Sequence, residues 1–153
     1  MEYAVAFYRV EAAPLAAVRR RMPAAHIPTR FREALDKVWG FLGKNPELRN
    51  DGHNVFLYRH DLDSDGAMTI DFGVQVTRLF EQDGEVFCAM TPAGEVAATT
   101  HRGPYGRLGE AHKAVQVMIA KSGRQTGGLS WEVYGDWNDD DAKLETEVIY
   151  LLQ

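Results

Sequence analysis

The sequence predicts an α+β fold: tandem β-α-β-β units with pseudo-twofold symmetry, which form an antiparallel sheet with two main helices on one face. One observation is an internal repeat, in which GHNVFLYRHDLDSDGAMTIDFGVQV from Gly52 aligns without a gap on GLSWEVYGDWNDDDAKLETEVIYLL from Gly128. Each copy consists of two alternating runs around an Asp-rich turn, which is typical of a hairpin. A helical pattern precedes each hairpin. We therefore expect one domain, residues 1–153, with repeats of about 1–78 and about 85–153.

Each unit is expected to open with a strand, YAVAFYRV in the first copy and GEVAATTHR in the second. In the first copy the longer connection EAAPLAAVRRRMPAAH follows, and we expect it to include a helical turn around Leu15 to Arg21. The turn QDGE at residues 82–85 should lead into the strand that joins the two copies.

Apolar residues spaced three and four apart predict one buried face on each helix. They are Ile27, Phe31, Leu35, Val38 and Leu42 in the first copy, and Leu108, Ala111, Val115, Met118 and Ile119 in the second. Pro28 and Pro104 suit a first helical turn, where a missing N–H costs no intrahelical bond. Asn45-Pro46 and Gly123 are expected to end the helices.

Composition excludes several classes of protein. The chain is 45% hydrophobic and 25% charged, as in a soluble globular domain, and its net charge of -5 argues against direct binding to nucleic acid. No apolar run approaches the roughly 20 residues that cross a bilayer. The single cysteine, Cys88, and the lack of a signal-like N-terminus predict a cytoplasmic protein.

No cofactor or metal site is expected. The Asp-rich stretch DLDSDG at 61–66 resembles the start of a calcium loop, but the twelfth position holds Phe72 instead of an acid. The histidines show no ligand spacing either: His53 and His60 should face opposite sides of a strand, and His101 and His112 should flank a helix. His101 with Arg102 could meet an anion at the helix N-terminus, although a purely structural role is favoured.

The strand Leu129 to Tyr134 contains an unexpected carboxylate, Glu132, among aromatic and aliphatic residues. At the repeat offset Glu132 takes the place of Phe56, while Tyr58 matches Tyr134. Burying a carboxylate costs free energy unless partners compensate for the lost hydration. The replacement of an aromatic residue by an acid therefore predicts a ligand-binding role for Glu132.

Two alternatives stay open for Glu132. It could point to water from an edge strand, or Arg59 or Arg102 could neutralise it. By strand parity Trp131 should face the opposite side of the sheet from Glu132.

The order of the units, the phrase THRGPYGRLGEAH at 100–112, and WEVYGDW followed by TEVIYLL resemble the GyrI-like small-molecule-binding family. This is the effector-binding domain of several bacterial transcription activators, which also occurs alone. The resemblance implies a pseudo-twofold domain with a central cleft for lipophilic, often cationic molecules, in which the acid at Glu132 meets the ligand's charge. Regulators of this family carry a DNA-binding module ahead of the domain, and this chain starts at the first strand, so we expect no stand-alone transcription factor.

Aromatic rings suit such a site because a ring face attracts a desolvated cation. The predicted ligand-binding residues are Glu132, Tyr134, Tyr105, Tyr58, Phe56, Tyr150 and Trp39.

Three functions follow from these observations. The favoured one is a free-standing sensor or sequestering protein for lipophilic, cationic or aromatic compounds. The second is a hydrolase of cyclopropanoid alkylating agents that uses Glu132 with Tyr134 or Tyr105, as the resemblance implies for some members. The third is a gyrase-inhibitor-like protein-interaction module. An edge strand could also pair two chains into a homodimer.

Overall fold

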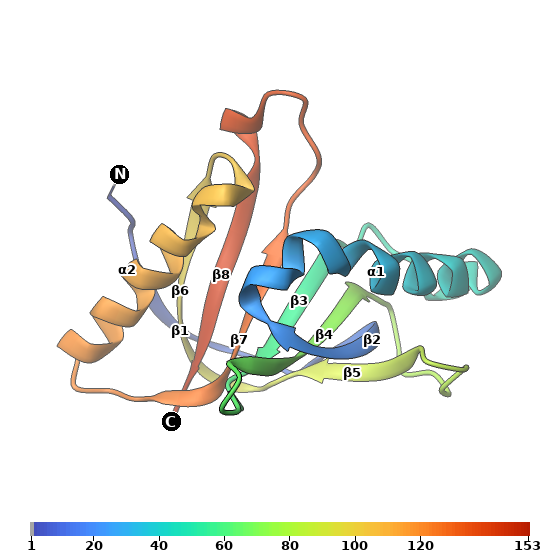
Figure 1. The fold of residues 1–153 in the computed structure, drawn as a ribbon, viewed down its shortest axis with the longest axis horizontal. Coiled ribbons are helices and arrows are strands. Elements are labelled where there is room, and N and C mark those ends of the chain that lie inside the picture. Colours follow the sequence, from blue (N-terminus) through green and yellow to red (C-terminus); the bar gives the residue numbers. More distant parts are fainter. Residues whose placement is uncertain (1) are drawn as a thin grey trace.

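The computed structural model describes residues 2–153, which form one eight-stranded antiparallel sheet and two helices (Figure 1). The strands are β1 (Ala6–Val10), β2 (Ala13–Pro23), β3 (Asn54–Arg59), β4 (Ala67–Gln75), β5 (Phe87–Thr91), β6 (Gly94–Arg102), β7 (Thr126–Tyr134) and β8 (Glu145–Leu152). The helices are α1 (Ile27–Lys44) and α2 (Leu108–Lys121), with the single 3-10 turns η1 (Ala24–His26), η2 (Pro46–Leu48), η3 (Tyr105–Arg107) and η4 (Asp141–Lys143). The predicted fold class is confirmed.

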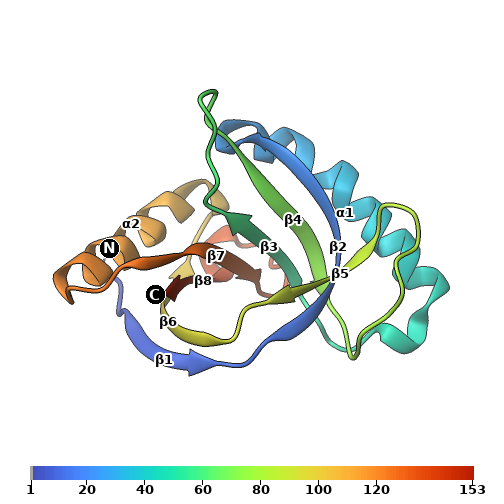
Figure 2. The ribbon, with the colours of Figure 1, turned by 90° about the horizontal axis from the view of Figure 1, so that it is seen from below.

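The sheet curls into a half-barrel, as Figure 2 shows from below. Its strand order is β1-β6-β8-β7-β3-β4-β2-β5. β1 is followed directly by β2, and β5 directly by β6. The β1–β6 and β2–β5 pairs have the same register, because Val10 pairs with Gly94 and Ala13 pairs with Thr91. Together these two pairs form one long ladder that connects the two ends of the sheet and brings them close to each other.

The centre of the sheet is the antiparallel pair β3 and β7, in which Phe56 lies directly opposite Glu132. These are the two positions that the internal repeat makes equivalent. Phe56 pairs on its other side with Phe72, and Glu132 with Val148, which again are equivalent positions. The pseudo-twofold axis therefore passes between Phe56 and Glu132, and Glu132 lies on a central strand and not at an edge.

Both helices cover the same face of the sheet. α1 packs Val38 and Leu42 into a cluster that includes Phe72, and α2 packs Val115 against Val148. Trp131 lies on the opposite face, in a cluster with strand residues of both units, as strand parity predicted.

The expectation of a helical turn around Leu15 to Arg21 is wrong, because this segment is part of β2. Alanine, leucine and arginine favour helices locally. Here, however, β2 pairs with β4 on one side and β5 on the other, so its backbone groups find partners only in an extended conformation. Leu15 to Val18 are fully buried as a result.

The helix boundaries follow the predicted signals, except that Pro104 is extended and precedes η3 instead of lying in the first turn of α2. α1 has Pro28 in its first turn and ends at Lys44, before Asn45-Pro46. α2 begins after Pro104 and η3 and ends at Lys121, two residues before Gly123. Within residues 2–153, neither helix is both long and apolar enough to cross a membrane.

Candidate functional site: a buried carboxylate between two cavities

Glu132 projects from β7 toward the helices and is only 4% exposed. Three hydrogen-bond donors surround its carboxylate. The hydroxyl groups of Tyr58 and Tyr134 both donate to Oε1, at 2.5 and 2.6 Å. Nε2 of His112 lies 2.6 Å from Oε2. These bonds replace the water that the carboxylate loses on burial.

His112 lies inside α2 and not beside it, which corrects the expectation that it flanks a helix. It follows Leu108 by four positions and precedes Val115 by three, so it occupies the stripe that faces the sheet. Its Nδ1 atom lies 2.7 Å from the Tyr150 hydroxyl. His112 thus connects the carboxylate on β7 to a phenol on β8.

The direction of each bond follows from its partners. An ionised carboxylate only accepts, so His112 donates its Nε2–H to Glu132. In a neutral imidazole the other nitrogen then accepts, and Tyr150 donates to it. In a protonated imidazole Nδ1 would donate to the Tyr150 oxygen instead. The network is satisfied in either charge state of His112.

The tyrosines remain protonated donors at neutral pH. Burial, and next the negative charge of Glu132, raise the pKa of Tyr58 and of Tyr134 well above the usual value. The same two causes raise the pKa of Tyr150 to about 12, against an opposing effect of a hydrogen bond with Ser130.

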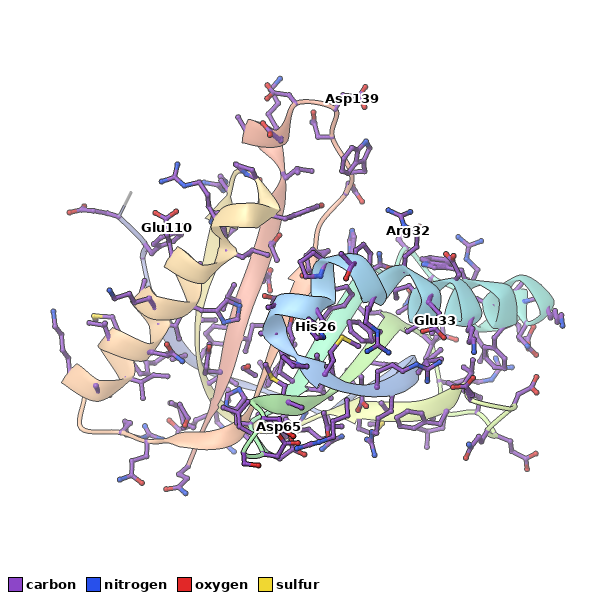
Figure 3. All side chains as sticks on the ribbon, in the orientation of Figure 1. His26, Arg32, Glu33, Asp65, Glu110 and Asp139 are labelled. Carbon is purple, nitrogen blue, oxygen red and sulfur yellow. The ribbon has the colours of Figure 1, made fainter. Side chains whose placement is uncertain are left out.

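No arginine or lysine of residues 2–153 forms an ion pair with Glu132, in contrast to other carboxylates of the molecule. Arg59 instead binds Asp71, and Arg102 pairs with Glu145. Of the acids labelled in Figure 3, Glu33 on α1 and Glu110 on α2 are each held by an arginine. Both alternatives considered for Glu132, exposure to water and neutralisation by Arg59 or Arg102, are therefore wrong.

Two cavities meet at Glu132, in the cleft between α1 and α2. Both are lined by Ala24, Tyr58 and Glu132. The first, cavity 1, has a volume of about 450 Å³ and is also lined by His60, Leu62, Met68, His112, Gln116, Ser130 and Tyr150. The second, cavity 2, has a volume of about 750 Å³ and is also lined by Ile27, Pro28, Phe31, Arg32, Leu35, Asn54, Phe56, Tyr105, Gly106, Leu108, Tyr134, Gly135 and Trp137.

Most of the predicted site residues come together here. Phe56, Tyr105 and Tyr134 line cavity 2, where the Tyr134 ring packs 4.8 Å from Phe56 and 5.4 Å from Tyr105, centroid to centroid. Tyr58 lines both cavities, and Tyr150 lines cavity 1. Trp39 is the exception: it lines neither cavity, and its ring nitrogen donates to Asn54 while Arg49 covers the ring.

Sequence reasoning missed His112, and with it the polar side of cavity 1. The available signal was a histidine at a position of the apolar helix stripe. It also missed the pair formed by His60, whose Nε2 lies 2.7 Å from Oγ of the buried Ser130. Burial, and next the nearby His112, lower the pKa of His60, which favours its neutral form. No sequence signal linked these residues, because His60 follows the end of β3 and Ser130 lies on β7, seventy positions later.

His101 has the structural role that was favoured for it. The side chain is 1% exposed, and its Nε2 donates to the carbonyl of Pro104 at 3.0 Å. Nδ1 then accepts from the Tyr3 hydroxyl at 2.8 Å. Within the described part of the chain, no three His, Cys, Asp or Glu side chains are grouped as a metal site.

Tyr150 makes the stability of the protein depend on pH in the alkaline range. The pKa of a tyrosine hydroxyl is about 10 in an unfolded chain, whereas the pKa of Tyr150 in the folded protein is about 12, so the folded state favours the protonated form. Its contribution is complete below about pH 10 and is lost as the pH rises through about 12. We expect this group alone to lower the free energy of unfolding by about 1 kcal/mol between pH 9 and 11. In urea denaturation, the free energy of unfolding of Tyr150→Phe should fall less steeply between pH 9 and 11 than that of the unaltered protein. Equal decreases in the two proteins would contradict the assignment of this pH dependence to Tyr150.

Comparisons with known proteins place this geometry in context. A family model described as GyrI-like small molecule binding domain matches residues 4–152. A search of curated proteins finds no match. Among solved structures, the C-terminal domain of EcmrR aligns with a TM-score of 0.78 at 20% identity, over 100% of this chain and 99% of that one. EcmrR in its DNA complex aligns with a TM-score of 0.81 at 19% identity, over 99% of this chain and 57% of that one.

Two further structures share the fold. SAV2435, solved with bound tetraphenylphosphonium, aligns with a TM-score of 0.73 at 13% identity, over 100% of this chain and 94% of that one. A hydrolase from Listeria innocua aligns with a TM-score of 0.68 at 11% identity, over 97% of this chain and 91% of that one. At these identities the likeness concerns the fold alone.

Proposed function

This chain belongs to the GyrI-like small molecule binding domain family, and from that premise we propose that it binds lipophilic cations with aromatic groups in the cleft at Glu132. In this role it acts as a sensor or as a sequestering protein. The observation that carries the proposal is the Glu132 carboxylate, which is buried where two cavities meet and is held by phenols and an imidazole. No arginine or lysine of residues 2–153 forms an ion pair with this carboxylate.

The surroundings of Glu132 suit an aromatic cation. Cavity 2 offers ring faces and edges from Phe31, Phe56, Tyr105, Tyr134 and Trp137. Such rings attract a desolvated cation by roughly 2 kcal/mol and also cover the apolar parts of the ligand. The cavity volumes lie within the range of about 300 to 1,000 Å³ that is typical of small-molecule sites.

The proposal is tested by a pair of ions with the same shape and opposite charge. Tetraphenylphosphonium, the compound bound to the similar SAV2435, is the cation, and tetraphenylborate is the anion. At a concentration of about 100 times its Kd, the cation should stabilise the folded state by about 2.7 kcal/mol. In a thermal-shift assay this corresponds to an increase in Tm of roughly 5 to 10 °C.

Tetraphenylborate should give little or no shift, because its charge would lie against Glu132. Equal shifts from both ions would show apolar binding without a role for the charge. No shift from either ion would overturn the proposal.

A hydrolase is the second candidate, and one observation favours it. A buried carboxylate in contact with two phenols and an imidazole is suited to moving a proton between a substrate and water. Hydrolysis of a cyclopropanoid alkylator adds water across a strained carbon–carbon bond. Mass spectrometry after incubation separates the two functions, since a binding protein leaves the compound intact and a hydrolase yields the ring-opened product.

A further inference from the structure

Part of the wall of each cavity comes from equivalent positions of the two β-α-β-β units. In the hairpins, equivalent residues are 76 positions apart, as Phe56 and Glu132 are. In the helices the separation is 81, which relates the start of α1 at Ile27 to the start of α2 at Leu108. It also relates η1 (Ala24–His26) to η3 (Tyr105–Arg107).

With these separations, five lining residues of cavity 2 have their equivalents in the lining of cavity 1. Phe31, Leu35, Asn54, Phe56 and Tyr134 of cavity 2 correspond to His112, Gln116, Ser130, Glu132 and Tyr58 of cavity 1. The two cavities therefore share an equivalent set of wall positions, which α1 and its hairpin supply in cavity 2 and α2 and its hairpin supply in cavity 1.

The equivalent side chains differ in polarity. Beside α1, Phe31 packs on Phe56 with ring centroids 5.7 Å apart. Beside α2, the same two places hold His112 and Glu132, joined by a hydrogen bond of 2.6 Å. The buried Leu35 beside α1 corresponds to Gln116, which is exposed. One cavity has thus an apolar wall and the other a hydrogen-bonding wall.

We infer that cavity 1 is a hydrogen-bonding subsite for the polar arm of an amphipathic cation, such as a hydroxyl, carbonyl or amide group. This inference rests on the proposed function, in which the aromatic part of the ligand occupies cavity 2 and its charge lies at Glu132. The preferred ligand is then not a uniformly apolar cation but one with an aromatic end and a polar end.

Cavity 1 has groups that can bind such an arm. The Gln116 amide offers a donor and an acceptor, and no side chain of residues 2–153 forms a hydrogen bond with it. Ser130 and His60, which bond to each other, add a hydroxyl and an imidazole. Because the neutral form of His60 is favoured, it adds no positive charge that would oppose a cation.

The test compares butyltriphenylphosphonium with (4-hydroxybutyl)triphenylphosphonium, which have the same charge and aromatic groups and differ by one terminal hydroxyl. Isothermal titration calorimetry gives the ratio of their two Kd values for each protein. Gln116→Leu introduces the residue found at the equivalent position of α1. In this variant the affinity for the alcohol, relative to that for the butyl compound, should fall by about 3- to 10-fold, which corresponds to the loss of one net hydrogen bond. Ser130→Ala should shift the ratio in the same direction.

Phe31→Leu is the matched control in cavity 2. It should weaken both ligands by a similar factor and leave the ratio unchanged. A ratio that is the same in the unaltered protein, Gln116→Leu and Ser130→Ala would overturn the subsite but not the proposed function. If neither ligand bound the unaltered protein, both the proposed function and the subsite would be overturned.

Discussion

Glu132→Gln should lower the affinity for tetraphenylphosphonium by roughly 10- to 100-fold. A unit charge about 5 Å from a carboxylate gains about 3 kcal/mol at an effective dielectric constant of about 20, and the amide removes this attraction. The shape of the site is kept, because the amide oxygen can accept from Tyr58 and Tyr134. His112 can change tautomer, accept from the amide at Nε2 and donate to Tyr150 from Nδ1.

Glu147→Gln is the matched control, since Glu147 lies on the neighbouring strand β8 and is exposed. It makes the same chemical change and should alter the affinity by less than about 2-fold. Calorimetry on both variants, with circular dichroism to verify the fold, measures the difference. Equal losses in the two variants, or no loss in Glu132→Gln, would remove the electrostatic role of Glu132.

Asp71→Ala should lower the free energy of unfolding by about 2 to 4 kcal/mol. Asp71 lies on β4, is 0% exposed, and faces away from the helices. It accepts from Arg19 at 2.7 and 3.1 Å and from Arg59 at 3.1 Å. Removal of one partner of a buried ionic cluster leaves the opposite charges uncompensated. The loss of stability should be smaller than for a fully buried ion pair, because both arginines are partly exposed and can be hydrated again in the variant.

Glu145→Ala is the comparison for this stability prediction. It breaks the exposed pair between Glu145 and Arg102 and should cost less than about 1 kcal/mol. Urea denaturation monitored by tryptophan fluorescence gives both values. Because Asp71 lies on the face opposite Glu132, Asp71→Ala should leave the Kd for tetraphenylphosphonium nearly unchanged at a temperature where the variant is folded. A loss of stability no larger than in Glu145→Ala would contradict the importance of this cluster.

The fold could be predicted where the local pattern and the tertiary structure agree. α1 shows this, because its apolar stripe, its early proline and the Asn45-Pro46 stop all describe one amphipathic helix. β2 shows the opposite. Its alanines and arginines have helical propensity, and the pairing with both β4 and β5 overrides that propensity. Such pairing joins residues more than forty positions apart, and no local pattern in the sequence indicates it.

The candidate site, too, could be predicted from the sequence only in part. The sequence by itself determined that an acid, Glu132, replaces Phe56 in a duplicated strand, and that Tyr58 and Tyr134 share its side of the sheet, because alternation along a strand and a constant repeat offset are local properties. Only the tertiary structure decided that His112 meets Glu132, that Tyr150 meets His112, and that two cavities lie on either side of the carboxylate. Those contacts depend on how α2 packs on the sheet and on where the twofold axis falls, and both are set by side chains far apart in the chain.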